Sequence, residues 1–91
     1  MDEKKETNHQ DLPAVAQRFL RYAKIDTQSA ENPDRYPSTD KQKDLSQLLV
    51  SELLALGLKD AAMDEWGIVT ATLLPNCGDK KVPTIGLIAH V

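Results

Sequence analysis

The chain has 91 residues, of which 41% are hydrophobic and 27% are charged, and its formal net charge is -3. This acidic balance argues against nucleic acid as a partner, because phosphate backbones are bound by clustered Lys and Arg. The chain has no apolar run of the ~20 residues that a membrane span needs, and no apolar signal segment near its start. The single cysteine, Cys77, fits a reducing compartment and is interpreted as a loop residue. We therefore expect a cytoplasmic protein with no nucleic-acid or membrane partner.

The first predicted helix follows a polar segment of mixed charge. Residues 1–11 are expected to be a disordered tail, and residues 12–91 are assigned to one incomplete domain. Apolar side chains then recur on one helical face, and Pro13 suits a first turn. The pattern predicts a helix over about residues 12–24 with Asp11 as its cap, followed by a polar loop over 30–37.

The second predicted helix has the clearest signals in the chain. Thr39 and Gln42 have the spacing of a capping box, in which the two residues satisfy backbone N–H groups at a helix start. Gly57 stands where a left-handed C-terminal residue belongs. Between them, leucines repeat with helical period at Leu45, Leu48, Leu49, Leu53 and Leu56.

The remainder of the chain predicts strands. Residues 59–64 and 68–74 are expected to pair as a hairpin, with Gly67 at positive φ in the turn between them. Residues 84–91 are apolar on both alternating sets of side chains, which is typical of a central strand covered on both faces. The predicted fold class is therefore α/β: two helices, a hairpin and a central buried strand. Such a strand needs more cover than two helices and a hairpin supply, so we expect a piece of a larger domain.

His90 lies near the carboxyl end of this predicted strand, where open α/β sheets place functional residues. A histidine satisfied within a core is the alternative interpretation. One imidazole cannot hold zinc alone, because zinc sites need three or four ligands from several segments. If His90 is a ligand, most of the site lies elsewhere in sequence.

The order and spacing of several short stretches together resemble the beginning of the peptidase T family. These enzymes are tripeptide aminopeptidases within a zinc-dependent metallopeptidase family that also includes acetylornithine deacetylase. The stretches are Arg18–Tyr22, Asp26–Ser29 (Asp-Thr-Gln-Ser), Tyr36–Thr39 (Tyr-Pro-Ser-Thr), Leu54–Leu58, Asp64–Leu73 and Pro83–Val91.

The resemblance implies a fold, a cofactor and a site. It makes the chain the N-terminal portion of a zinc-peptidase catalytic domain and His90 a metal ligand, within a His-x-Asp motif whose aspartate would directly follow Val91. An aspartate two residues along a strand shares the histidine's face and can orient it. The full-length enzyme would hold two zinc ions, cleave the N-terminal residue from tripeptides and form a homodimer. No catalytic residue would lie within the chain, which alone is expected to be inactive.

Two alternatives remain open at this point. The full protein would instead be a related amino-acid deacylase or carboxypeptidase, or the chain would be a non-catalytic truncated interaction module. Asp26, Thr27, Ser38 and Thr39 also have two interpretations. They would shape the substrate side of the site or, as we prefer, have a structural role, with Thr39 as a helix cap and Asp26 as a helix-exit residue.

Overall fold

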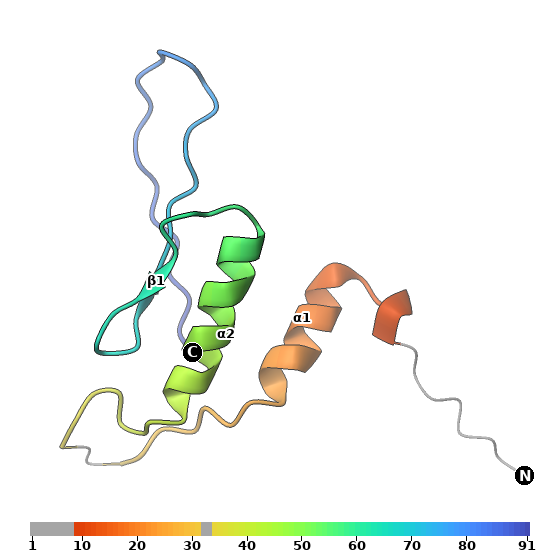
Figure 1. Cartoon of the computed structure of the whole chain (residues 1–91), viewed down its shortest axis with the longest axis vertical. Helices are drawn as coiled ribbons and strands as arrows, with labels where there is room; N and C mark the ends of the chain where they lie inside the picture. Colours follow the sequence, from red (N-terminus) through yellow and green to blue (C-terminus); the bar gives the residue numbers. More distant parts are fainter. Residues whose placement is uncertain (1–8, 32–33) are drawn as a thin grey trace, which may run out of the picture.

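The computed structural model describes residues 9–31 and 34–91, and it shows two helices and a small two-stranded sheet (Figure 1). The elements in chain order are η1 (His9–Asp11), α1 (Ala14–Ala23), α2 (Gln42–Ala55), β1 (Ala62–Met63) and β2 (Val69–Thr70). The radius of gyration is 17.5 Å, against ~12 Å for a compact domain of this length. The mixed α/β composition is confirmed, but the chain is far more extended than a globular domain.

The start of α1 differs from the prediction. Asp11 belongs to the 3₁₀ turn η1, and Pro13 occupies the position before the first helical residue, with no side chain capping the helix. Asp11 therefore does not cap α1, because it lies too far ahead of Ala14. Residues 1–8 of the expected tail lie outside the described residues. Within Ala14–Ala23 no residue is buried, and Val15 and Phe19 of the predicted apolar stripe are 73% and 69% exposed.

Helix α2 confirms the prediction at its C-terminal end. Gly57 has φ of +97°, its N–H donates to the Leu54 carbonyl at 3.0 Å, and the Leu58 N–H donates to the Leu53 carbonyl at 3.1 Å. These two bonds form a Schellman motif, which satisfies carbonyls that the helix itself leaves free. At the other end only half of the capping box forms: the Gln42 side chain accepts from the Thr39 N–H, while the Thr39 hydroxyl bonds elsewhere.

The hairpin is present but shorter than predicted. β1 and β2 are antiparallel, with Ala62 opposite Thr70 and Met63 opposite Val69. The carboxylate of Asp60 accepts from the Thr72 N–H at 2.8 Å, which extends the contact two residues beyond the Ala62–Thr70 pair. α2 packs against both strands, and the buried residues of the described chain gather at this contact: Leu45, Ser46 and Ala61.

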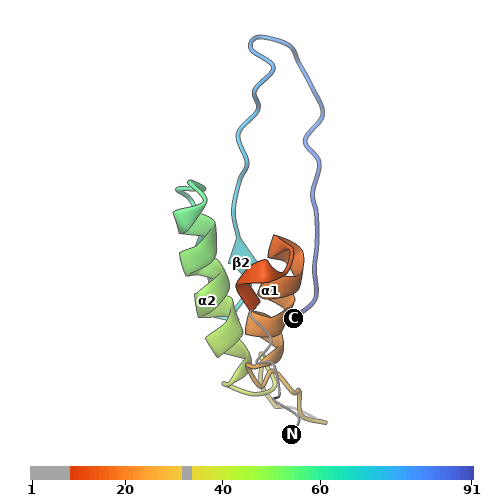
Figure 2. The same ribbon diagram turned by 90° about the vertical axis from the view of Figure 1, so that its right-hand side faces the viewer.

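The predicted central strand over 84–91 is wrong for this structure. Residues 71–91 leave β2, turn and return without forming a strand, and residues 84–91 are all exposed. Figures 1 and 2 show this segment as a long excursion whose two arms stand apart in the second view. The physical reason is the lack of neighbours: no described segment pairs with 84–91, and no described helix covers its faces.

Candidate functional site

His90 lies at the return of this excursion, beside the loop that joins the two helices. It is exposed, and it lines a cavity of about 670 Å³ between that loop, the first residue of α2 and the turn of the hairpin. The side chains that line this cavity include Ser29, Tyr36, Ser38, Gln42 and Trp66, together with His90. The structure thus brings His90 next to both loop motifs of the sequence, Asp26–Ser29 and Tyr36–Thr39.

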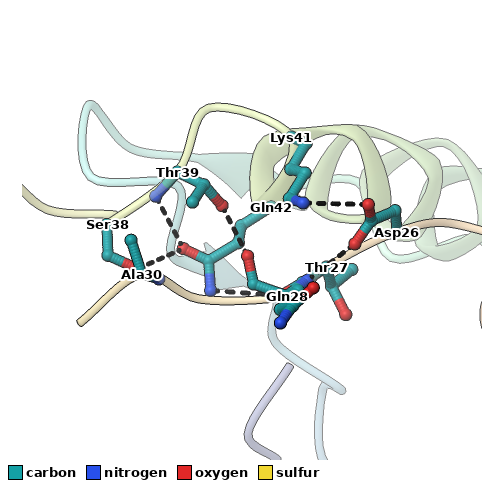
Figure 3. Close-up of polar contacts among 8 residues, drawn as sticks. All are labelled: Asp26, Thr27, Gln28, Ala30, Ser38, Thr39, Lys41 and Gln42. Carbon is teal, nitrogen blue, oxygen red and sulfur yellow. Dashed lines mark hydrogen bonds and ion pairs between the residues drawn. The ribbon is translucent and has the colours of Figure 1, made fainter.

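The two motifs are held together by the side chain of Gln42 (Figure 3). Its Oε1 accepts from the Thr39 N–H at 3.3 Å and from the Ser38 hydroxyl at 3.4 Å, while its Nε2 donates to the Thr27 carbonyl at 3.3 Å. One amide at the start of α2 therefore joins both halves of the loop. The spacing of Gln42 in the sequence predicts a capping box but not its bond with Thr27.

Two further bonds connect the halves of the loop directly. The Thr39 hydroxyl donates to the Gln28 carbonyl at 2.9 Å, and the Ala30 N–H donates to the Ser38 hydroxyl at 3.0 Å (Figure 3). Both hydroxyls are thus engaged within the loop. The preferred structural role is thus supported, but the Thr39 hydroxyl bonds across the loop and does not cap α2 as predicted.

Asp26 also has a structural role. Its Oδ1 accepts from the Gln28 N–H at 3.0 Å, and its Oδ2 accepts from the Lys41 ammonium at 2.8 Å. The Lys41 bond and the Gln28 N–H lower the pKa of the Asp26 carboxyl below its ordinary value. Asp26 therefore stays ionised around neutral pH and ties the exit of α1 to the start of α2.

The hairpin side of the cavity is fixed by Asp64. Its carboxylate accepts from the Trp66 and Ile68 N–H groups, both at 2.9 Å, and Gly67 between them has φ of +83°, as predicted. The Gly67 carbonyl accepts from the Ser46 hydroxyl at 2.7 Å, and Ser46 is only 2% exposed. The turn that carries Trp66 is thus attached to α2 four residues after Gln42.

The two helices are joined at a second place that the sequence did not reveal. Glu52 of α2 accepts from Nε and Nη2 of Arg21 at 3.0 and 2.8 Å, and from the Tyr22 hydroxyl. The Tyr22 hydrogen bond is the main cause that lowers the pKa of Glu52, and desolvation together with Glu52 raises the pKa of Tyr22. The partners are about 30 residues apart, so no local pattern signals the contact.

The predicted metal ligand does not have partners here. Among residues 9–31 and 34–91, no group of three or more His, Cys, Asp or Glu side chains could hold a metal ion. His90 is a suitable zinc donor by chemistry, but the described residues alone do not form a zinc site. Further ligands would have to come from outside them, and no catalytic step can be built on a metal here.

A second, larger groove of about 960 Å³ adjoins the His90 cavity. Leucines of α2, the strand β2 and residues 87–91 line much of it, and His90 borders both spaces. The groove is thus an uncovered, mostly apolar surface of the fold.

Within residues 9–31 and 34–91, no helix has the length and apolar character needed to cross a membrane.

Several curated proteins that are similar to this chain carry the same name, peptidase T. No family model and no solved structure matches the chain. Peptidase T of Alkaliphilus oremlandii (strain OhILAs) is 56% identical over 78 residues, and peptidase T of Clostridium botulinum (strain Hall) is 54% identical over 77. The match covers 85% of this chain but only 19% of each relative, so the chain spans about a fifth of the length of these curated proteins. The chain is thus a homologue of peptidase T, related to its N-terminal fifth.

Proposed function

We propose that the chain supplies the first part of the catalytic domain of a zinc-dependent tripeptide aminopeptidase, with His90 as one zinc ligand. The observation that carries this proposal is identity of 56% and 54% to two peptidase T proteins over 85% of the chain. The position of His90 is consistent with it, since the imidazole is exposed and borders a cavity walled by both peptidase T-like loop motifs.

The uncovered apolar surfaces support the same proposal. Leu87 and Ile88 are 94% and 100% exposed, and the alternating pattern of 84–91 provides apolar side chains on both faces. An isolated extended segment of this kind has unpaired N–H and C=O groups along both edges. The remaining four-fifths of a peptidase T chain would supply the neighbouring strands and covering helices that this segment lacks.

A chimera tests the proposal. The 91-residue chain replaces the matching part of A. oremlandii peptidase T, and hydrolysis of Leu-Gly-Gly is measured with and without a metal chelator. We expect activity that the chelator removes, and loss of both activity and bound zinc in His90→Ala. The matched control is His9→Ala, which removes the other histidine of the chain and should leave both readouts unchanged.

Two results would contradict the proposal. One is a folded chimera that contains zinc yet cleaves no tripeptide. The other is unchanged zinc content in His90→Ala, which would show that the imidazole is not a ligand. The 91-residue chain without the rest of the enzyme is expected to cleave no tripeptide under the same conditions.

A further inference from the structure

The cavity beside His90 has a chemical character that the loop motifs alone do not reveal. None of the described residues that line it is Asp, Glu, Lys or Arg. Two large aromatic side chains stand at its wall, and both are largely open to solvent, with Tyr36 72% and Trp66 52% exposed. A tripeptide's charged ends are bound best by charged partners. The lining therefore suits an uncharged part of a peptide.

Two sides of this cavity, the loop between the helices and the turn of the hairpin, are held in place. Gln42 fixes the loop before and after Tyr36, and Asp64 and Ser46 fix the turn that carries Trp66. The volume of about 670 Å³ falls within the range of ~300–1,000 Å³ that is typical of small-molecule sites. A loop and a turn that are already fixed can contact a bound side chain without the entropic cost of ordering them.

We propose that this cavity is a subsite that receives one uncharged side chain of a peptide held beside His90, with Tyr36 and Trp66 as its specificity-determining residues. The inference rests on the proposed function and goes beyond it by naming where and how the substrate side chain is recognised. Tyr36 and Trp66 contact the apolar side chain with their rings. The charged ends of the peptide lie outside this cavity.

The test uses the chimera described above and three leucine-scanned tripeptides: Leu-Gly-Gly, Gly-Leu-Gly and Gly-Gly-Leu. We expect Trp66→Ala and Tyr36→Ala to lower kcat/KM about tenfold for the one peptide whose leucine enters the cavity, mainly through KM. The other two peptides should change less than about twofold. Replacing the leucine of that peptide by lysine should lower its kcat/KM in the unmodified chimera.

Controls separate loss of the subsite from loss of folding. Tyr36→Phe keeps the ring and should behave like the unmodified chimera. Leu74→Ala removes a comparably exposed apolar side chain, 77% exposed, at a position that does not line the cavity. A melting temperature for each variant shows whether the chimera remains folded.

Equilibrium binding of the same peptides, measured by calorimetry, makes the outcome independent of catalysis. Selective weakening of one peptide by the aromatic substitutions supports the subsite even if the chimera cleaves nothing, which would count against the proposed function alone. Equal losses for all three peptides, no loss in either variant, or no peptide binding at all would each overturn the subsite.

Discussion

The exposed segment 84–91 leads to the sharpest prediction about the chain on its own. Ile85, Leu87 and Ile88 are 79%, 94% and 100% exposed, and the segment has no strand partner among the described residues. Contiguous apolar side chains on an unpaired edge favour association with a second copy. We therefore expect the 91-residue chain to be poorly soluble or molten alone, and Ile88→Lys to reduce its self-association.

The size of this effect follows from the exposure of Ile88. Burying a fully exposed isoleucine in an intermolecular contact contributes ~1.5–3 kcal/mol, which corresponds to roughly 10- to 150-fold in an association constant. Lysine at the same position loses this gain and adds a charge that would need to be desolvated. The association constant of Ile88→Lys should therefore fall by at least about tenfold.

Sedimentation velocity over a concentration series measures the constant, with Thr84→Lys as the matched control. Both variants change the formal net charge from -3 to -2, so repulsion between chains weakens equally in both. Only Ile88→Lys removes an apolar side chain. Equal behaviour of the two variants, or a soluble monomer with a cooperative melt and well-dispersed amide signals from the unmodified chain, would refute the reasoning.

Three further predictions concern the contacts that hold the described elements, each measured in the peptidase T chimera, where the rest of the domain covers the exposed segment. Glu52→Gln should weaken the attachment of α1 to α2 by ~1 kcal/mol, a figure already reduced because Arg21 is exposed to solvent. Tryptic cleavage within α1 should therefore become about fivefold faster. Glu65→Gln in the exposed turn is the control. Gly57→Ala should lower the free energy of unfolding by ~1–2 kcal/mol, because φ is +97° while the space around an added Cβ is open; an unchanged denaturation midpoint would contradict this. The Asp60 carboxyl, whose pKa is lowered by its bonds to Thr72, stabilises the hairpin above its ordinary pKa of about 3.9 and stops doing so as pH falls through its lower folded value. The Thr72 amide shift should therefore titrate with a midpoint below that value, and Asp60→Asn should abolish the titration.

The parts of the fold that could be predicted are those with local causes. The leucine period of α2, the glycine that ends it and the glycine in the hairpin turn all act within a few residues of themselves, and the structure confirms each. Gly57 and Gly67 are informative because only glycine adopts positive φ without strain. The resemblance to peptidase T is likewise a matter of ordered local motifs, and the comparisons confirm it.

The parts that could not be predicted depend on distant partners. The Glu52 contact with Arg21 and Tyr22 and the link from Gln42 to Thr27 join segments separated by loops. The central strand was predicted from an apolar pattern that indicates burial but cannot provide the neighbours that burial requires. His90 could be singled out by its residue type and position, whereas its zinc role depends on ligands outside the described residues and stays a prediction.

The buried hydroxyl of Ser46 has a consequence for the angular setting of α2. Successive helical residues are about 100° apart around the axis, so this short side chain reaches the Gly67 carbonyl at only one rotation of the helix. An alanine at the same place would pack equally well over a range of rotations. The Ser46 bond thereby selects which leucines of α2 face the hairpin and which do not.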